Sequence, residues 1–124
     1  MTRLPVRTER GSGSILVLGV TIVVLMFGVA AIGVGGYLVA GHRARSAADL
    51  AALSGAADFV AGRDACDGAK RNARVNGARV VSCSQVGDQL DFVVTVQVEI
   101  PVQILVPGLP GSAQAKAFAG AVSE

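Results

Sequence analysis

The clearest pattern in the sequence is an apolar, charge-free run from Ile15 to Gly41. It is longer than the roughly 20 residues that a helix needs to cross the hydrocarbon core of a bilayer. A cleaved secretory signal would have a shorter apolar region and would be followed by a clear small-residue cleavage site. This run is too long, and no clear cleavage site follows it. The pattern therefore predicts a retained transmembrane helix over residues 15–41, preceded by a short segment over residues 1–14.

Apolar positions continue beyond this run at helical spacing. They recur three, four and three residues apart and so share one stripe of a helix. The stripe consists of Leu50, Leu53, Ala57 and Val60. The opposite positions are small or charged, and include Asp49 and Asp58. Because no proline interrupts residues 15–60, we expect one long helix whose outer half is amphipathic.

A second, shorter helix is predicted to begin after Asp64, a residue type that favours the N-cap, and to stop at Asn76–Gly77. Asp67 and Arg71 are spaced to form an ion pair along it. Its predicted apolar face holds Cys66, Ala69 and Ala73, and its predicted solvent side holds Lys70, Arg71 and Arg74.

Strand signals follow the second helix. Residues 79–84 are short and rich in β-formers, residues 90–100 alternate between apolar and polar positions, and residues 113–122 alternate weakly. We expect a small antiparallel sheet of two or three strands, whose apolar face covers the stripe at Leu50. The apolar segment 104–111 either packs under this sheet or forms an exposed contact surface. The fold class is therefore α+β, with an outer domain over residues 42–124.

The two cysteines, Cys66 and Cys83, both lie beyond the apolar run. Their spacing fits neither a CxxC motif nor a zinc knuckle. A disulfide is favoured over two free buried thiols or a metal site, and it requires an oxidising compartment.

Three arginines precede the apolar run and two follow it, which favours a cytoplasmic N-terminus. We expect a single-pass protein of the cell membrane, with residues 1–14 in the cytoplasm and the C-terminal domain outside.

Charge and residue content exclude several classes of function. A net charge of +2 and the few aromatic residues argue against a nucleic-acid partner. His42, the single histidine, is expected to be an interfacial anchor, and no catalytic constellation or cofactor site is recognisable.

Within the membrane, Gly28, Ala31 and Gly35 share one helix face, where small side chains let another helix approach closely. The predicted surroundings are therefore membrane lipid and partner helices.

Five segments together resemble a known family. They are Glu9–Ser14 before the apolar run, His42–Leu53 after it, Ala65–Cys66, Asn76–Cys83, and the strand from Leu90. In this layout the chain resembles the TadE/TadG-like proteins of tight-adherence (Flp) pilus systems, especially their short actinobacterial TadE-like members. The resemblance implies a pilin-like fold and a pseudopilin-like accessory role in a type IV pilus or related secretion system. It further implies other pilus or secretion-system membrane proteins as partners, and no enzymatic activity.

The chain departs from the prepilin pattern at one point. Prepilins are cut after a glycine and carry a glutamate at the fifth mature position, but a cut after Gly11 or Gly13 would place Leu16 or Leu18 there. We therefore expect an unprocessed N-terminus. The alternative function is an exported protein, released outside the cell as a binding or effector domain.

Overall fold

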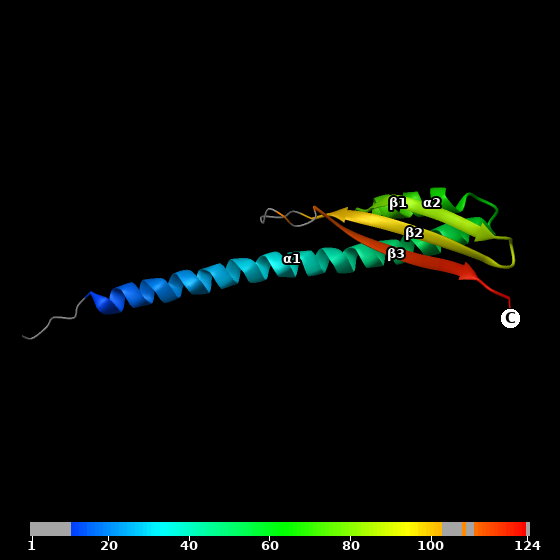
Figure 1. Ribbon diagram of the computed structural model, residues 1–124. Helices are drawn as coiled ribbons and strands as arrows, with labels where there is room; N and C mark the ends of the chain where they lie inside the picture. The colour runs from blue at the N-terminus through cyan, green and yellow to red at the C-terminus, as the bar shows by residue number, and fades with distance from the viewer. Residues whose placement is uncertain (1–10, 103–107, 109–110, 124) are drawn as a thin grey trace, which may run out of the picture. The chain divides into compact units, whose positions relative to one another are not determined.

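The computed structural model describes residues 11–102, 108 and 111–123. Two helices are followed by three strands (Figure 1). The elements are α1 (Ser12–Val60), α2 (Ala65–Val75), β1 (Arg79–Gly87), β2 (Phe92–Pro101) and β3 (Ser112–Ala121). The predicted α+β class and order of elements are confirmed. Most of the apolar segment 104–111 lies outside the described residues.

The chain divides into two units, residues 1–34 and residues 35–124. Helix α1 contributes to both units. In the first unit, every described side chain is exposed. The helix is apolar and long enough to cross a membrane, and it is the one such helix in the described part of the chain. The length of this helix and its exposed apolar side chains suggest a single-pass membrane protein.

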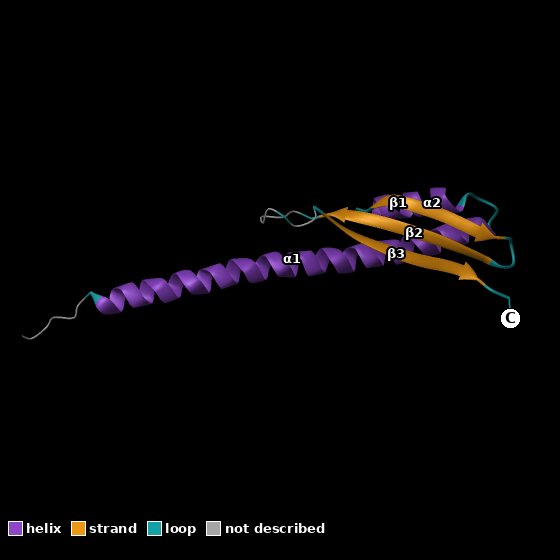
Figure 2. Cartoon of the chain, viewed as in Figure 1, coloured by secondary structure: helices purple, strands orange, loops and turns teal. Residues whose placement is uncertain are grey.

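The second unit is built on a three-stranded antiparallel sheet in the order β1-β2-β3 (Figure 2). Its central strand β2 alternates as predicted, because Phe92, Val94, Val96 and Val98 are buried. The first strand is longer than expected and reaches Gly87. The second begins at Phe92 rather than Leu90, because the Asp88 carboxylate accepts hydrogen bonds from the backbone N–H groups of Leu90 and Asp91 and so closes the turn.

The face of α1 that meets the sheet is made of alanine. The buried residues between positions 44 and 52 are Ala44, Ala47, Ala48, Ala51 and Ala52. The last four belong to the same core as Val94, Val96 and Val98 of β2. Alanine side chains are short, so this face of α1 lets the helix backbone come close to the sheet.

The expectation that the sheet covers the Leu50 stripe is therefore wrong. Leu50, Leu53 and Val60 are 44%, 60% and 63% exposed, and Ala57 is exposed as well. The sheet packs on the face of α1 that carries the small side chains. The prediction chose the face with the largest apolar side chains. The close approach of a helix to a sheet instead favours small side chains.

Helix α2 matches its predicted bounds. The Asp64 carboxylate accepts a hydrogen bond from the backbone N–H of Asp67, as an N-cap does, and Gly77 follows the C-terminus with φ 71°. Its buried residues are Ala65, Gly68, Ala69 and Ala73. A disulfide joins Cys66 of α2 to Cys83 of β1, with 5.8 Å between the two Cα atoms. The short helix is thus linked to the sheet edge both covalently and through its alanines.

The alanine face predicts an asymmetry between neighbouring positions of α1. Ala51→Leu should destabilise the second unit by about 1–3 kcal/mol, because the larger side chain has no room against β2. Leu53→Ala, two residues away on the exposed face, should change stability by no more than about 0.5 kcal/mol. Denaturant unfolding of the purified full chain in detergent micelles measures both. A greater loss for Leu53→Ala than for Ala51→Leu would contradict this packing.

Candidate assembly surface

Helix α1 presents a face of small residues in its apolar part. No atom lies within 4 Å of the position that a Cβ would take at Gly28 or Gly35, apart from the helix's own backbone and immediate neighbours. Gly28 and Ala31 are exposed, and Gly35 is half-buried. These positions are open for a second helix to approach, and their role in helix packing remains a prediction.

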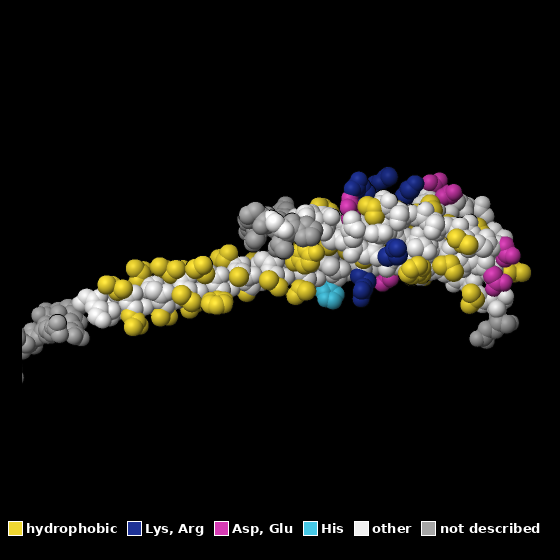
Figure 3. All heavy atoms as spheres, viewed as in Figure 1, with side chains coloured by type: hydrophobic (Ala, Val, Ile, Leu, Met, Phe, Trp, Pro, Cys, Tyr) yellow, Lys and Arg dark blue, Asp and Glu magenta, His cyan; other side chains and the backbone are white. Residues whose placement is uncertain are grey.

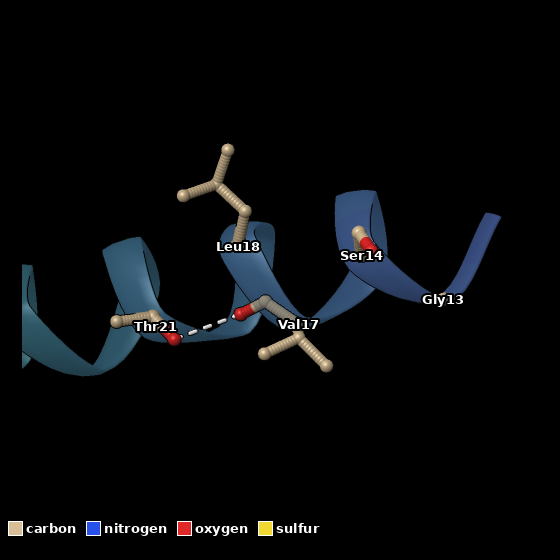
Figure 4. Close-up of a pocket in the computed structure, with 5 residues that line it drawn as sticks. All are labelled: Gly13, Ser14, Val17, Leu18 and Thr21. Atoms are coloured by element: carbon tan, nitrogen blue, oxygen red, sulfur yellow. Dashed lines mark hydrogen bonds between the residues drawn. The ribbon is translucent and has the colours of Figure 1, made fainter. Parts of the chain in front are cut away.

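A shallow hollow lies near the start of the same helix (Figure 4). It is lined by Gly13, Ser14, Val17, Leu18 and Thr21, with a volume of about 410 Å³ that is largely open to the outside. The hydroxyl of Thr21 donates to the carbonyl oxygen of Val17 at 2.8 Å, so this polar group is satisfied inside the helix. A shallow, mostly apolar depression of this kind suits a side chain of a neighbouring helix better than a polar ligand.

The second exposed surface of α1 is the Leu50 stripe, which consists of Leu50, Leu53, Ala57 and Val60. It lies in the second unit, on the side of the helix away from the sheet. Hydrophobic side chains are visible on the surface of this unit among charged ones (Figure 3). Three large apolar residues in helical register, without cover in the described chain, are typical of a contact surface.

Asp58 holds the end of α1 against α2, which the sequence did not predict. It was expected on the exposed polar side, but it is only 7% exposed. Its Oδ1 accepts hydrogen bonds from Nη2 of Arg63 at 2.6 Å and from Nε at 3.1 Å. Its Oδ2 accepts one from Nη2 of Arg71 at 2.5 Å. The hydrogen bonds from Arg63 lower the pKa of Asp58 below its ordinary 3.8; desolvation opposes this shift, and the charges of Arg63 and Arg71 reinforce it.

Arg71 therefore has a different partner from the predicted one. The expected pair with Asp67 is absent from the ion pairs of the described residues, and Arg71 reaches across to Asp58 of α1 instead. A signal for this arrangement is present in the sequence. Asp58 follows Ala44 and Ala51 at intervals of seven residues, so it continues the buried alanine line rather than the polar face.

The other charged side chains remain at the surface. Lys70 and Arg74 are exposed as predicted, and Arg79 forms an ion pair with Glu99 on the neighbouring strand. His42 is exposed. Across the described ranges, His, Cys, Asp and Glu side chains do not gather in groups of three that could hold a metal ion. The features that stand out are apolar surfaces for contact, rather than a chemical centre.

A family model described as "Putative Flp pilus-assembly TadE/G-like" matches residues 11–58. Those residues form a TadE/G-like segment. The resemblance seen in the sequence is thereby confirmed over this part, which is less than half of the 124 residues. No curated protein and no solved structure gave a match. The TadE/G-like segment coincides almost completely with α1, and it contains the glycine face, the alanine face and most of the Leu50 stripe.

The Asp58 contacts predict a pH-dependent stability. Asp58→Asn should lower the midpoint of thermal unfolding at pH 7, because the two arginines lose their charged partner. Since the folded-state pKa lies below 3.8, the contribution of the carboxylate is present above pH 3.8 and is lost as the pH falls through the lowered pKa. Wild type and variant should therefore converge only below pH 3.8.

Asp49→Asn is the matched control, because Asp49 is an exposed acid on the same helix. Its thermal midpoint at pH 7 should equal that of wild type. Melting curves of the full chain in detergent, taken from pH 7 to pH 3, provide the comparison. An unchanged midpoint for Asp58→Asn at pH 7 would show that these ion pairs do not hold α1 to α2.

Proposed function

We propose that this chain is a pseudopilin-like accessory component of a tight-adherence (Flp) type IV pilus or a related secretion system. It acts through helix packing and protein–protein contacts rather than through catalysis. The observation that carries the proposal is the coincidence of the TadE/G-like segment with α1. The family relationship supports a role related to the Flp pilus, and it lies in the helix whose two apolar surfaces have no partner in the described chain.

The open glycine face supports packing with other membrane helices. Helices in lipid associate where small residues let their backbones approach, because lipid tails give no hydrophobic advantage to larger apolar contacts. Gly28, Ala31 and Gly35 lie at such a spacing. The Leu50 stripe continues the available surface beyond the apolar run, so one helix offers contacts both in lipid and outside it.

The disulfide supports the proposed orientation. A bond between Cys66 and Cys83 persists in an oxidising compartment, which supports a position outside the cytoplasm for the second unit. The positive charge of residues 1–14 favours the cytoplasmic side for the N-terminus. We therefore place the N-terminus in the cytoplasm and the C-terminal domain outside, at the cell membrane.

Site-specific photocrosslinking tests the glycine face. A photoreactive residue at Val24, one helical turn before Gly28, should give adducts with a neighbouring membrane helix in intact cells. Gly28→Leu combined with Gly35→Leu should reduce these adducts by about tenfold, because the bulky side chains keep the backbones apart. The yield of adduct relative to total protein is the measurement.

Gly33→Leu is the matched control. Gly33 lies between the two test positions in depth, but about 140° around the helix from Gly28 at 3.6 residues per turn. It should leave the adducts unchanged. Equal adduct yields in wild type and the double variant, or an equal loss in the control, would refute packing through this face.

Protease added to intact spheroplasts tests the orientation. The second unit should be digested from outside while a tag on the N-terminus stays protected, because the bilayer shields the cytoplasmic side. Protection of the second unit from the protease would show that the orientation is the opposite of the proposed one. Recovery of residues 42–124 free in the medium, with a new N-terminus near Gly41, would favour the released binding or effector protein instead.

A further inference from the structure

The second unit contains an apolar groove with a single charged residue on its wall. One wall is the start of the unit's part of α1, and the other is the end of β2. The lining residues are Gly35, Gly36, Val39, Ala40, Arg43, Ile100, Pro101 and Val102. Its volume is about 380 Å³, which lies within the roughly 300–1,000 Å³ range of small-molecule sites.

The groove is shaped by the way the sheet approaches the helix. Ala40 and Ala44 are buried in a small core with Ala113, and Ile100 and Val102 pack against this core. Gly35 and Gly36 have no side chains to fill the space beside it. A Cβ placed at Gly36 would meet no atom within 4 Å outside the helix's own backbone and neighbours. The glycines therefore keep the groove open where the sheet ends.

Along α1, the groove runs from the last part of the charge-free run 15–41 to Arg43, the first charged residue after it. Residues 15–34 alone supply the roughly 20 apolar positions that a span requires. Gly35 follows directly, and Arg43 lies about 12 Å further along the helix at 1.5 Å per residue. The headgroup layer is only about 5–8 Å thick, but an arginine side chain extends back along apolar surface to reach it. The groove thus covers the step from lipid tails to headgroups.

Charge at this end of the unit favours an anionic occupant. Arg43 lines the groove, and Arg45 follows it on α1. Arg79, at the start of β1, lies at the same end, where its charge is offset by the ion pair with Glu99. Lys70, Arg74 and Arg79 line a further hollow beside that strand start. By contrast, Asp88 and Asp91 lie in the turn at the opposite end of β1 and β2.

We propose that this groove binds one anionic phospholipid. Its acyl chain lies along Gly36 and Val39 against Ile100 and Val102, and its phosphate contacts the guanidinium of Arg43. The choice of a phospholipid follows from the continuity of the groove with the apolar run and from its single cation. The inference rests on the membrane anchoring in the proposed function, and not on the role in a pilus.

Native mass spectrometry of the full chain in detergent tests the site. Phosphatidylglycerol and phosphatidylcholine with identical acyl chains are added in turn. Wild type should retain one phosphatidylglycerol and little phosphatidylcholine. Arg43→Gln should reduce the phosphatidylglycerol adduct about fivefold, the effect expected of one cation at an anionic surface. Gly36→Leu should abolish it, because the added side chain fills the groove without pressing on the fold.

Arg45→Gln is the matched control. It removes one positive charge two residues from Arg43, at a position that does not line the groove. It should keep the adduct within about twofold of wild type. The proposal would be overturned by equal retention of both lipids, by an unaffected adduct in Arg43→Gln, or by a protein dimer that Gly36→Leu removes. Val24 photocrosslinking of Gly36→Leu separates the two proposals: adducts should persist there, because Gly36 is not part of the Gly28 face.

Discussion

The packing of an alanine face on a valine face organises the second unit. Ala47, Ala48, Ala51 and Ala52 of α1 share one core with Val94, Val96 and Val98 of β2. Such a layer buries little apolar area per residue, so its stability depends on a close fit. Gly55 shows how close the fit is, because a Cβ there would stand 3.1 Å from Cγ1 of Val94.

This layer explains why Leu50, Leu53 and Val60 of α1 face outward. Phe59, near the end of the helix, instead packs against Phe92 of β2, with 4.8 Å between the ring centroids. A helix has a limited circumference, and the side that approaches the sheet is occupied by small side chains. Leu50, Leu53 and Val60 are left on the other side, where they are available for contacts with another molecule. The TadE/G-like match covers this same helix and ends before α2 and the sheet. The family relationship and the available surfaces therefore fall on one element.

Two further links keep α2 in place beside α1 and the sheet. The Cys66–Cys83 disulfide joins α2 to β1, and Asp58 accepts hydrogen bonds from Arg63 after α1 and from Arg71 in α2. A thin alanine core gives a domain of this size a limited hydrophobic contribution, so covalent and ionic links carry more weight than they would in a larger domain. Both links lie on α2, which presents its charged side chains to solvent.

The sequence by itself determined the elements and their order. The charge-free run, Asp64 with Asn76–Gly77, and the alternation from Phe92 to Val98 each depend on local periodicity or capping, which are properties of neighbouring residues. The resemblance carried by His42–Leu53 pointed to the TadE/G-like family. The burial of Asp58 had one signal in the sequence, its seven-residue spacing from Ala51 and Ala44. Only the tertiary structure decided which face of α1 meets the sheet and that Arg71 pairs with Asp58. These depend on the distance between a helix and a sheet, and small residues that permit a close approach carry almost no hydrophobic signal in the sequence.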